Sequence, residues 1–364
     1  MAKSPPEYVG FGMLTPVEIM VLEKLPKHNT GAIVTEVNEF VFDDAAIVAC
    51  LLRQWDVSAG MIGTAVGDDP RGHALAKQLK DWDVQGEVRF TKEYKTPLEV
   101  NVSDRKGART YFWQRTPQIL STLNTADLSL LHGSKILYAD WYDGDHILRA
   151  MDEANRLHVP VFVNLEYGHK DPEILKQYAK RATFCQAVTD AAQIGGRRAL
   201  EGTARKLLKS GIKTAIITLA KGGCLVAHGN EIVRVIAPHV KAVDACGAGA
   251  TFSAGFIYGH LKGWNLEKSA KFATAAASLK VTRAGLQMFP VEQIQELAER
   301  LKVEHWAFKN DRFEIIDRIL DLPRQVAVQG KRAQKKILHD LRLPSKSETP
   351  KVNHPHARTK RKVI

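Results

Sequence analysis

The stretch DACGAGATF, residues 244–252, decides how the rest of the chain is interpreted. An apolar run at residues 233–237 precedes it, and an unbroken helical pattern at residues 252–261 follows it. Gly247 and Gly249 allow the backbone to turn tightly into the helix and leave its first N–H groups uncovered. Free N–H groups and the positive end of the helix dipole attract anions. The stretch therefore predicts a strand, a turn and a helix that starts with an anion site, although the same turn can also exist without a ligand.

Three further stretches combine glycines with regular structure. In GMIGTAVGDDPRG, residues 60–72, a strand ends in glycines and two acids cap the helix that follows. TLAKGG, residues 218–223, is a turn between two apolar strands. FATAAASLKVTRAG, residues 272–285, is a helix of small residues that ends in a glycine turn. Each of them, taken alone, is equally compatible with a turn or a closely packed helix that binds nothing.

Taken together, residues 8–301 resemble the ribokinase/PfkB family of sugar and nucleoside kinases. The resemblance implies an α/β fold of the ribokinase type, with a mostly parallel central sheet, flanking helices and a small β lid. It implies ATP and Mg²⁺ as cofactors and, through the lid, a homodimer. Ala220 replaces a glycine of the family's pattern, which is tolerable only if its φ is negative. By the same resemblance, the anion hole is formed by Gly247, Ala248 and Gly249, and Asp244 belongs to a cation loop. Asp190 is a weak candidate for a metal ligand. The nucleotide would be surrounded by Thr218, Ala220, Gly223, Ala277 and Gly285.

The substrate side departs from the family. Ala250 stands where family members carry the aspartate that serves as catalytic base. An early sugar-binding aspartate is replaced near residues 16–17 by Pro and Val. Phe42, Asp43 and Ile47 occupy positions where the family has two glycines and an asparagine. Phe and Ile offer no hydrogen-bonding groups for a sugar. Several independent losses favour a natural non-catalytic relative over an engineered knock-out.

Loss of the base has a defined chemical cost. A positioned general base typically raises the reaction rate about 10²–10⁴-fold, and this contribution is lost. The anion hole, which stabilises charge on the transferred group, is kept. Asp43 and Asp44 could approach from the other side of the cleft, but the sequence gives no geometry for this. The leading hypothesis is an impaired kinase that binds a nucleotide or phosphorylated ligand in a regulatory or scaffolding role. The alternatives are an active ATP-dependent kinase of a sugar or nucleoside, and a nucleic-acid-associated protein.

Short β-type runs alternate with helical patterns, which predicts βαβ units on a mostly parallel sheet. Residues 1–305 are expected to form the kinase-like domain, with lid strands within about 87–115, and residues 306–364 a basic extension, helical and then disordered. The expected central strands are 60–66, 135–139, 159–164, 183–188, 214–219 and 224–228, the lid strands are 87–90, 98–103 and 110–113, and the helices are 44–55, 71–82, 145–157, 202–210, 248–261, 267–281 and 291–301.

The charge is concentrated at the end of the chain. The net charge is +12, and residues 324–364 contain 12 Lys and Arg but 2 Asp and Glu. This tail predicts contact with polyanions, or else a solvated tail with no partner. The four cysteines are widely spaced, which predicts buried free thiols. No run of 18 apolar residues is visible, so no membrane span is expected. No secretory signal is visible either, so secretion is not expected and a cytoplasmic location is expected.

Overall fold

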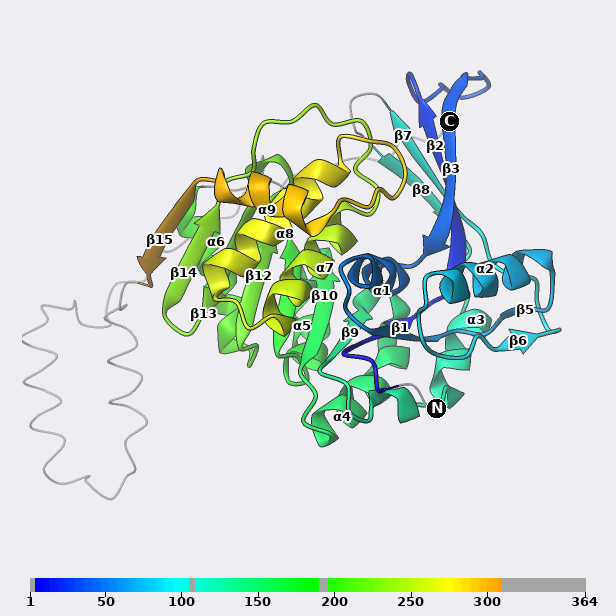
Figure 1. Ribbon diagram of the computed structural model, residues 1–364, viewed down its shortest axis with the longest axis horizontal. Coiled ribbons are helices and arrows are strands. Elements are labelled where there is room, and N and C mark those ends of the chain that lie inside the picture. The colour runs from blue at the N-terminus through cyan, green and yellow to red at the C-terminus, as the bar shows by residue number, and fades with distance from the viewer. Residues whose placement is uncertain (1–3, 105–108, 190–195, 309–364) are drawn as a thin grey trace, which may run out of the picture. The chain divides into compact units, whose positions relative to one another are not determined.

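The structure is a computed structural model that describes residues 4–104, 109–189 and 196–308. These residues form a nine-stranded sheet with helices on both faces and a separate four-stranded sheet at one end (Figure 1). The expected α/β class, a mostly parallel central sheet with a small β lid, is confirmed. The compact unit extends through Phe308. The basic segment that is expected to contact polyanions, residues 324–364, lies outside the described residues.

The central sheet joins six parallel strands to three antiparallel ones. The parallel strands are buried on both faces, which explains their continuous apolar sequences. The first two antiparallel strands follow through short turns, whereas the third returns to the edge of the sheet only after the helices within residues 248–299. In sheet order the strands are β15 (Val303–Ala307), β14 (Glu231–Val235), β13 (Cys224–His228), β12 (Thr214–Thr218), β11 (Phe184–Val188), β10 (Val161–Glu166), β9 (Ile136–Asp140), β1 (Tyr8–Gly12) and β4 (Ala59–Gly63).

Alternate side chains of each strand enter two different apolar cores. In β9, for example, Ile136 and Tyr138 face one core while Leu137 and Ala139 face the other. This alternation follows from the period of two in a strand. The first core is covered by α1 (Asp44–Gln54), α2 (Pro70–Asp81), α7 (Ala248–Leu261), α8 (Leu266–Lys280) and α9 (Val291–Glu299), and the second by α4 (Leu148–Arg156), α5 (Pro172–Ala179) and α6 (Arg197–Lys209).

The lid differs from the predicted one. It is a four-stranded sheet in the order β3 (Val34–Phe42), β2 (Thr15–Leu22), β7 (Glu99–Asp104) and β8 (Arg109–Trp113). The two outer pairs are antiparallel and β2 is parallel to β7. The predicted lid strand at 87–90 is wrong, because only Phe90–Thr91 (β6) is a strand and it pairs with Val66–Gly67 (β5) in a separate sheet. Strands β2 and β3 were not predicted from the sequence.

Capping residues set several helix ends where the sequence predicted them. Asp69 accepts a hydrogen bond from the Gly72 N–H at the start of α2. The helix predicted at 145–157 begins only at Leu148, because residues 141–147 form a 3₁₀ segment interrupted by Gly144. The helix predicted at 202–210 begins earlier, at Arg197. Strands β1 and β15, helix α5 and the short helix α3 (Pro117–Ser121) were not assigned from the sequence.

The four cysteines, Cys50, Cys185, Cys224 and Cys246, are free and buried, as predicted. No helix among the described residues is long and apolar enough to cross a bilayer.

Candidate functional site

The turn at residues 247–249 has the geometry of an uncapped helix start. Gly247 is the N-cap of α7, with φ 72° and ψ 4°, and no side chain hydrogen-bonds to the first turn. A non-glycine residue would be strained in this left-handed conformation. The Ala248 N–H donates to the Ala245 carbonyl at 3.3 Å, but the N–H groups that follow it in this 14-residue helix remain available, together with the positive end of the helix dipole. This arrangement, here called the anion loop (Gly247, Ala248 and Gly249), is suited to phosphate oxygens.

A buried ion pair lies beneath the anion loop. Asp244 and Lys280 are both fully buried, and the Lys280 Nζ donates to Asp244 Oδ2 at 2.8 Å. The same carboxylate accepts hydrogen bonds from the Cys246 N–H at 2.9 Å and the Ser103 hydroxyl at 2.6 Å. The Gly285 N–H donates at 3.2 Å to Asp244 Oδ2, the same oxygen that accepts from Lys280. Asp244, expected in a cation loop, is thus paired with the ammonium group of Lys280.

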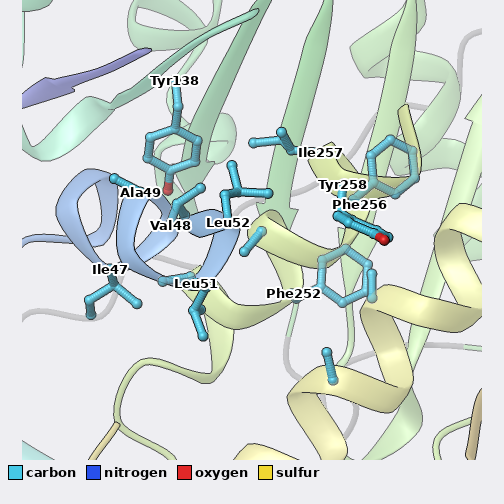
Figure 2. Close-up of a cluster of buried hydrophobic side chains, with 14 of the residues drawn as sticks. Ile47, Val48, Ala49, Leu51, Leu52, Tyr138, Phe252, Phe256, Ile257 and Tyr258 are labelled. Atoms are coloured by element: carbon cyan, nitrogen blue, oxygen red, sulfur yellow. The ribbon is translucent and has the colours of Figure 1, made fainter. Parts of the chain in front are cut away.

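Position 250 is enclosed by apolar side chains. Ala250 is fully buried in the core that also contains Ile47 and Phe252. Side chains from α1 and α7 fill the space between these two helices (Figure 2). A carboxylate base at this position would have to share a closely packed interior. The observed side chain offers neither a base nor a hydrogen-bond acceptor.

The room in front of the anion loop is small. A Cβ atom placed on Gly247 would lie 3.7 Å from the Cδ1 atom of Ile47 and 3.7 Å from that of Leu286. The cavity between the lid and the loop has a volume of about 10 Å³, which is room for about one water molecule. It is lined by apolar side chains and one glycine: Val17, Ile19, Phe40, Ile47, Cys246, Gly247 and Leu286. Ile47 thus fills space that the resemblance assigns to a sugar, and Phe42 ends the adjoining strand β3.

The predicted nucleotide positions fall around the ends of β12 and α8. Thr218 ends β12, and Gly223 immediately precedes β13. The Thr274 hydroxyl, one helical turn before Ala277, lies 3.3 Å from the Cys224 Sγ. Helix α8 therefore approaches the turn between β12 and β13. The condition placed on Ala220 is wrong: its φ is +46°, a left-handed conformation stabilised by the 3₁₀ turn at 220–222. Asp190 lies outside the described residues.

A group of acidic side chains surrounds the N-terminus of α1. Asp43 is the N-cap, and its carboxylate accepts a hydrogen bond from the Asp44 N–H at 2.6 Å. Arg115 donates to Asp43 and, at 2.6 Å, to Asp143. The other members of the group come from neighbouring strands. We call these six residues the carboxylate cluster: Asp43, Asp44, Glu99, Asp140, Asp143 and Glu166.

Burial and mutual repulsion disturb the ionisation of this cluster. Burial raises the pKa of Asp44, and the charges of Asp43 and Glu166 raise it further. The pKa of Asp140 is raised by burial and by Asp43 and Asp44. Burial and Asp43 raise the pKa of Glu99 to about 8. Such shifts arise where charges of one sign are brought together in a poorly solvated place, and they are frequent in functional sites.

Sequence reasoning identified only Asp43 and Asp44 in this cluster. Asp140 and Glu166 end the neighbouring parallel strands β9 and β10. Ligands of open α/β sheets bind beyond the carboxyl ends of the strands, so polar residues at these two ends were a signal that could have been used. Glu99 and Arg115 lie on and after lid strands, and nothing local in the sequence distinguishes them.

Comparison with known proteins points to one family. A family model described as pfkB family carbohydrate kinase matches residues 34–293. The chain is 26% identical over 261 residues to an ATP-dependent 6-phosphofructokinase of Thermoanaerobacterium thermosaccharolyticum, covering 67% of this chain and 80% of the relative. It is 25% identical over 276 residues to a 5-dehydro-2-deoxygluconokinase of Listeria innocua, covering 68% and 82%.

Solved structures share the fold. A putative ribokinase from Agrobacterium tumefaciens superposes with a TM-score of 0.71 at 18% identity, covering 82% of this chain and 98% of the other. Arabidopsis thaliana ribokinase, complexed with ribose and ATP, gives a TM-score of 0.65 at 19% identity, covering 81% and 99%. These likenesses confirm the ribokinase-like fold that the four glycine-containing stretches predicted.

Proposed function

Because this chain belongs to the pfkB family of carbohydrate kinases, we propose that it binds a nucleotide or phosphorylated ligand but transfers phosphate to an alcohol slowly or not at all. The ligand-binding state would then serve a regulatory or scaffolding role. The observation that carries the proposal is the environment of position 250. A buried alanine among apolar side chains stands at the start of α7, beside an intact anion loop.

The chemistry separates binding from transfer. Backbone N–H groups at the start of α7 can hold phosphate oxygens and stabilise negative charge as it moves during transfer. Transfer to an alcohol also needs a group that takes the hydroxyl proton, and a positioned base is worth about 10²–10⁴-fold. Ala250 cannot take a proton. The anion loop alone therefore supports binding and only a slow reaction.

ATP with Mg²⁺ is the family's cofactor pair, and the described residues fit its two parts unequally. The anion loop fits the phosphates, and the turn around Thr218, Ala220 and Gly223 would hold the nucleotide together with Ala277 and Gly285. No group of three His, Cys, Asp or Glu within residues 4–104, 109–189 and 196–308 is arranged to hold a metal ion. Mg²⁺ would supply charge neutralisation on the phosphates when bound, which leaves the nucleotide itself as its main ligand.

A second candidate function is an active phosphotransferase that uses another base. The observation in its favour is Asp44, a partly exposed carboxylate at the N-terminus of α1 with a raised pKa. A base with a raised pKa is suited to accept a proton near neutral pH. Asp44 also lies near Tyr138, which in turn is beside Ser253 of α7. In this alternative, Asp44→Asn abolishes transfer to a sugar or nucleoside hydroxyl.

Turnover measurements distinguish the two candidates. Phosphoryl transfer from ATP is measured over a panel of sugars and nucleosides for the wild type, Ala250→Asp and the matched control Ala250→Asn, which has the same shape but no base. We expect wild-type transfer at the background rate and all three proteins within about tenfold of one another, because Ile47 fills the adjoining space.

Two results would contradict the proposal. Robust wild-type turnover that Asp44→Asn abolishes would establish the second candidate. A gain of about 10²-fold or more in Ala250→Asp but not in Ala250→Asn would mean that only the base was missing and that the acceptor site is intact.

Partners beyond small molecules are also proposed. Exposed apolar side chains on the outer lid strands, Val34 and Val37 of β3 and Phe112 and Trp113 of β8, support a homodimer through the lid. The basic segment 324–364 would contact polyanions through its Lys and Arg residues. Polyanion binding by the full chain and by a chain ending at residue 323, at two salt concentrations, tests the second point. Equal binding by both would remove the tail from consideration.

A further inference from the structure

The carboxylate cluster has more negative charge than its surroundings neutralise. Its six carboxylates come from the N-terminus of α1, the lid, the ends of β9 and β10, and the 3₁₀ segment at residues 141–147. Arg115 is the one cation that pairs with them among the described residues, and it binds only Asp43 and Asp143. Within residues 4–104, 109–189 and 196–308, no Lys, Arg or His forms an ion pair with Asp44, Glu99, Asp140 or Glu166.

The partners of these remaining carboxylates are neutral. Asp140 accepts hydrogen bonds from the Asn164 amide at 2.9 Å and from the Tyr142 N–H at 3.0 Å. Asp44 has only a long contact of 3.5 Å with the same amide. Glu166 accepts from the Tyr142 hydroxyl at 2.8 Å. Neutral donors satisfy hydrogen bonds but do not compensate charge, so buried carboxylates in that condition either keep a proton or bind a cation.

Tyr138 provides an independent indication of a ligand. Its side chain is fully buried, and its hydroxyl has no hydrogen-bond partner. Asp44 and Asp140 are its principal charged neighbours, and the hydroxyl points toward α1 (Figure 2). Ser253 lies beside it and donates its hydroxyl proton to Gln186 at 2.9 Å, but it makes no hydrogen bond with the Tyr138 hydroxyl. An unpaired buried hydroxyl is costly, so a group supplied from outside would restore its hydrogen bond.

The cluster can be reached from solvent and adjoins the anion loop. Asp44 and Glu166 are partly exposed, and Tyr142 is 40% exposed. Cys246 of the turn before α7 and Glu166 and Asp44 of the cluster all act electrostatically on Tyr111 of the lid. A ligand held by the cluster would therefore lie on the lid side of the same cleft as the anion loop.

We propose that the carboxylate cluster binds a polyhydroxylated ligand that carries a protonated amine, in the chemical class of amino sugars. The ammonium group pairs with Asp44 and Asp140, and a ligand oxygen accepts the hydrogen bond of the Tyr138 hydroxyl. Glu166 accepts from a ligand hydroxyl at the open side of the cluster. The inference rests on the proposed function for its location in the cleft, but it requires no phosphoryl transfer.

Two other occupants fit less well. A divalent metal ion needs several ligands converging at short distances, and within the described part of the chain no three acidic or His/Cys side chains do so. A neutral sugar supplies hydroxyl donors but no charge. A protonated amine supplies both donors and charge, and hydrogen bonds between charged groups are the stronger kind.

The test measures ligand binding by calorimetry with the full chain and no nucleotide. The probes are glucose, glucosamine and N-acetylglucosamine, and the corresponding galactose series, so that the amine is present, absent or neutralised on the same ring. We expect each amino sugar to bind about 10- to 100-fold more tightly than its two neutral analogues, the gain of a charge-assisted hydrogen bond.

Two variants and one control locate the effect. Asp44→Asn and Asp140→Asn keep a hydrogen-bond acceptor but remove the charge, and each is expected to reduce the amine preference at least about tenfold. Asp171→Asn, at the exposed N-cap of α5, removes a carboxylate elsewhere and is expected to leave the preference unchanged. Because the cluster is crowded with like charges, both cluster variants are expected to unfold at the same or a higher temperature than the wild type.

Four outcomes would overturn the inference. These are equal affinity for amino and neutral sugars, no detectable binding by any probe, an amine preference that persists in Asp44→Asn and Asp140→Asn, and Mg²⁺ or Ca²⁺ binding that those two variants abolish. Since no nucleotide is present, failure here leaves the turnover result unaffected. Conversely, robust phosphoryl transfer would reject the proposed impairment without changing the amine preference.

Discussion

The N-termini of α1 and α7 lie on the two sides of the same cleft and are constructed in opposite ways. At α1, Asp43 caps the helix and Asp44 occupies its first turn, so the positive end of the helix dipole is already compensated by carboxylates. At α7, Gly247 turns the chain in a left-handed conformation and no side chain caps the helix. One helix start is open to an anion, whereas the other excludes anions and attracts cations.

The charges beneath the two helix starts differ as well. Under the anion loop, Asp244 is matched by Lys280 and by three neutral donors. Around α1, one guanidinium faces six carboxylates. A compensated pair holds a backbone in place, whereas an uncompensated group favours a ligand that brings the missing charge. This contrast explains why a phosphate is assigned to one side and an ammonium group to the other.

The largest effect on stability is expected when the ion pair between Asp244 and Lys280 is broken. Lys280→Met leaves the Asp244 carboxylate buried without its cation and should lower the free energy of unfolding by about 3–5 kcal/mol. Urea denaturation measures it. The matched control is Lys262→Met at the exposed end of α7, which should change stability by less than about 0.5 kcal/mol. A loss below about 1 kcal/mol in Lys280→Met would mean that the pair does not support the loop.

The two sides also differed in how far the sequence predicted them. Residues 244–261 specify the anion loop and α7 locally, through two glycines and an apolar helix, and the structure has both. Asp69 likewise caps its helix as its spacing predicted. These features depend on neighbours within a few residues along the chain.

The carboxylate cluster depends instead on contacts between distant segments. Arg115 meets Asp43 across 72 positions and Asp143 across 28. The lid strand Thr15–Leu22 pairs with Glu99–Asp104, far along the chain, so its short alternating pattern was not recognised. Ala220 was misjudged for a related reason, since its positive φ is imposed by the turn between β12 and β13 rather than by its own preference. Local patterns carry no information about such assemblies.

The next largest effect is the dependence of stability on pH, which tests the carboxylate cluster. The pKa of Glu99 is raised to about 8, so the folded state keeps a proton that the unfolded state releases near pH 4.5. The stabilisation is complete below about pH 4.5 and is lost as the pH rises through about 8, so wild-type stability should fall by about 2–4 kcal/mol over that range. Glu99→Gln should flatten this decline. Denaturation at several pH values measures both proteins.

The control for this effect lies on the same lid. Glu39 is exposed on β3, and Glu39→Gln should leave the decline with pH as it is in the wild type. If Glu99→Gln and Glu39→Gln behave alike, the cluster does not repel the Glu99 charge. The contrast between the two helix starts would then have to rest on Asp44 and Asp140 alone.

The smallest effect compares the two ends of α7. Gly247 and Gly263 have φ values of 72° and 68°, and a Cβ atom at either position meets no backbone. Gly247→Ala and Gly263→Ala should therefore lose similar stability, about 1 kcal/mol each. Only Gly247→Ala disturbs the anion loop, so only it should weaken nucleotide binding, by about tenfold in calorimetry. Equal nucleotide affinity in the two variants, with equal loss of stability, would remove the phosphate from the start of α7 and leave the carboxylate cluster as the one ligand site of the cleft.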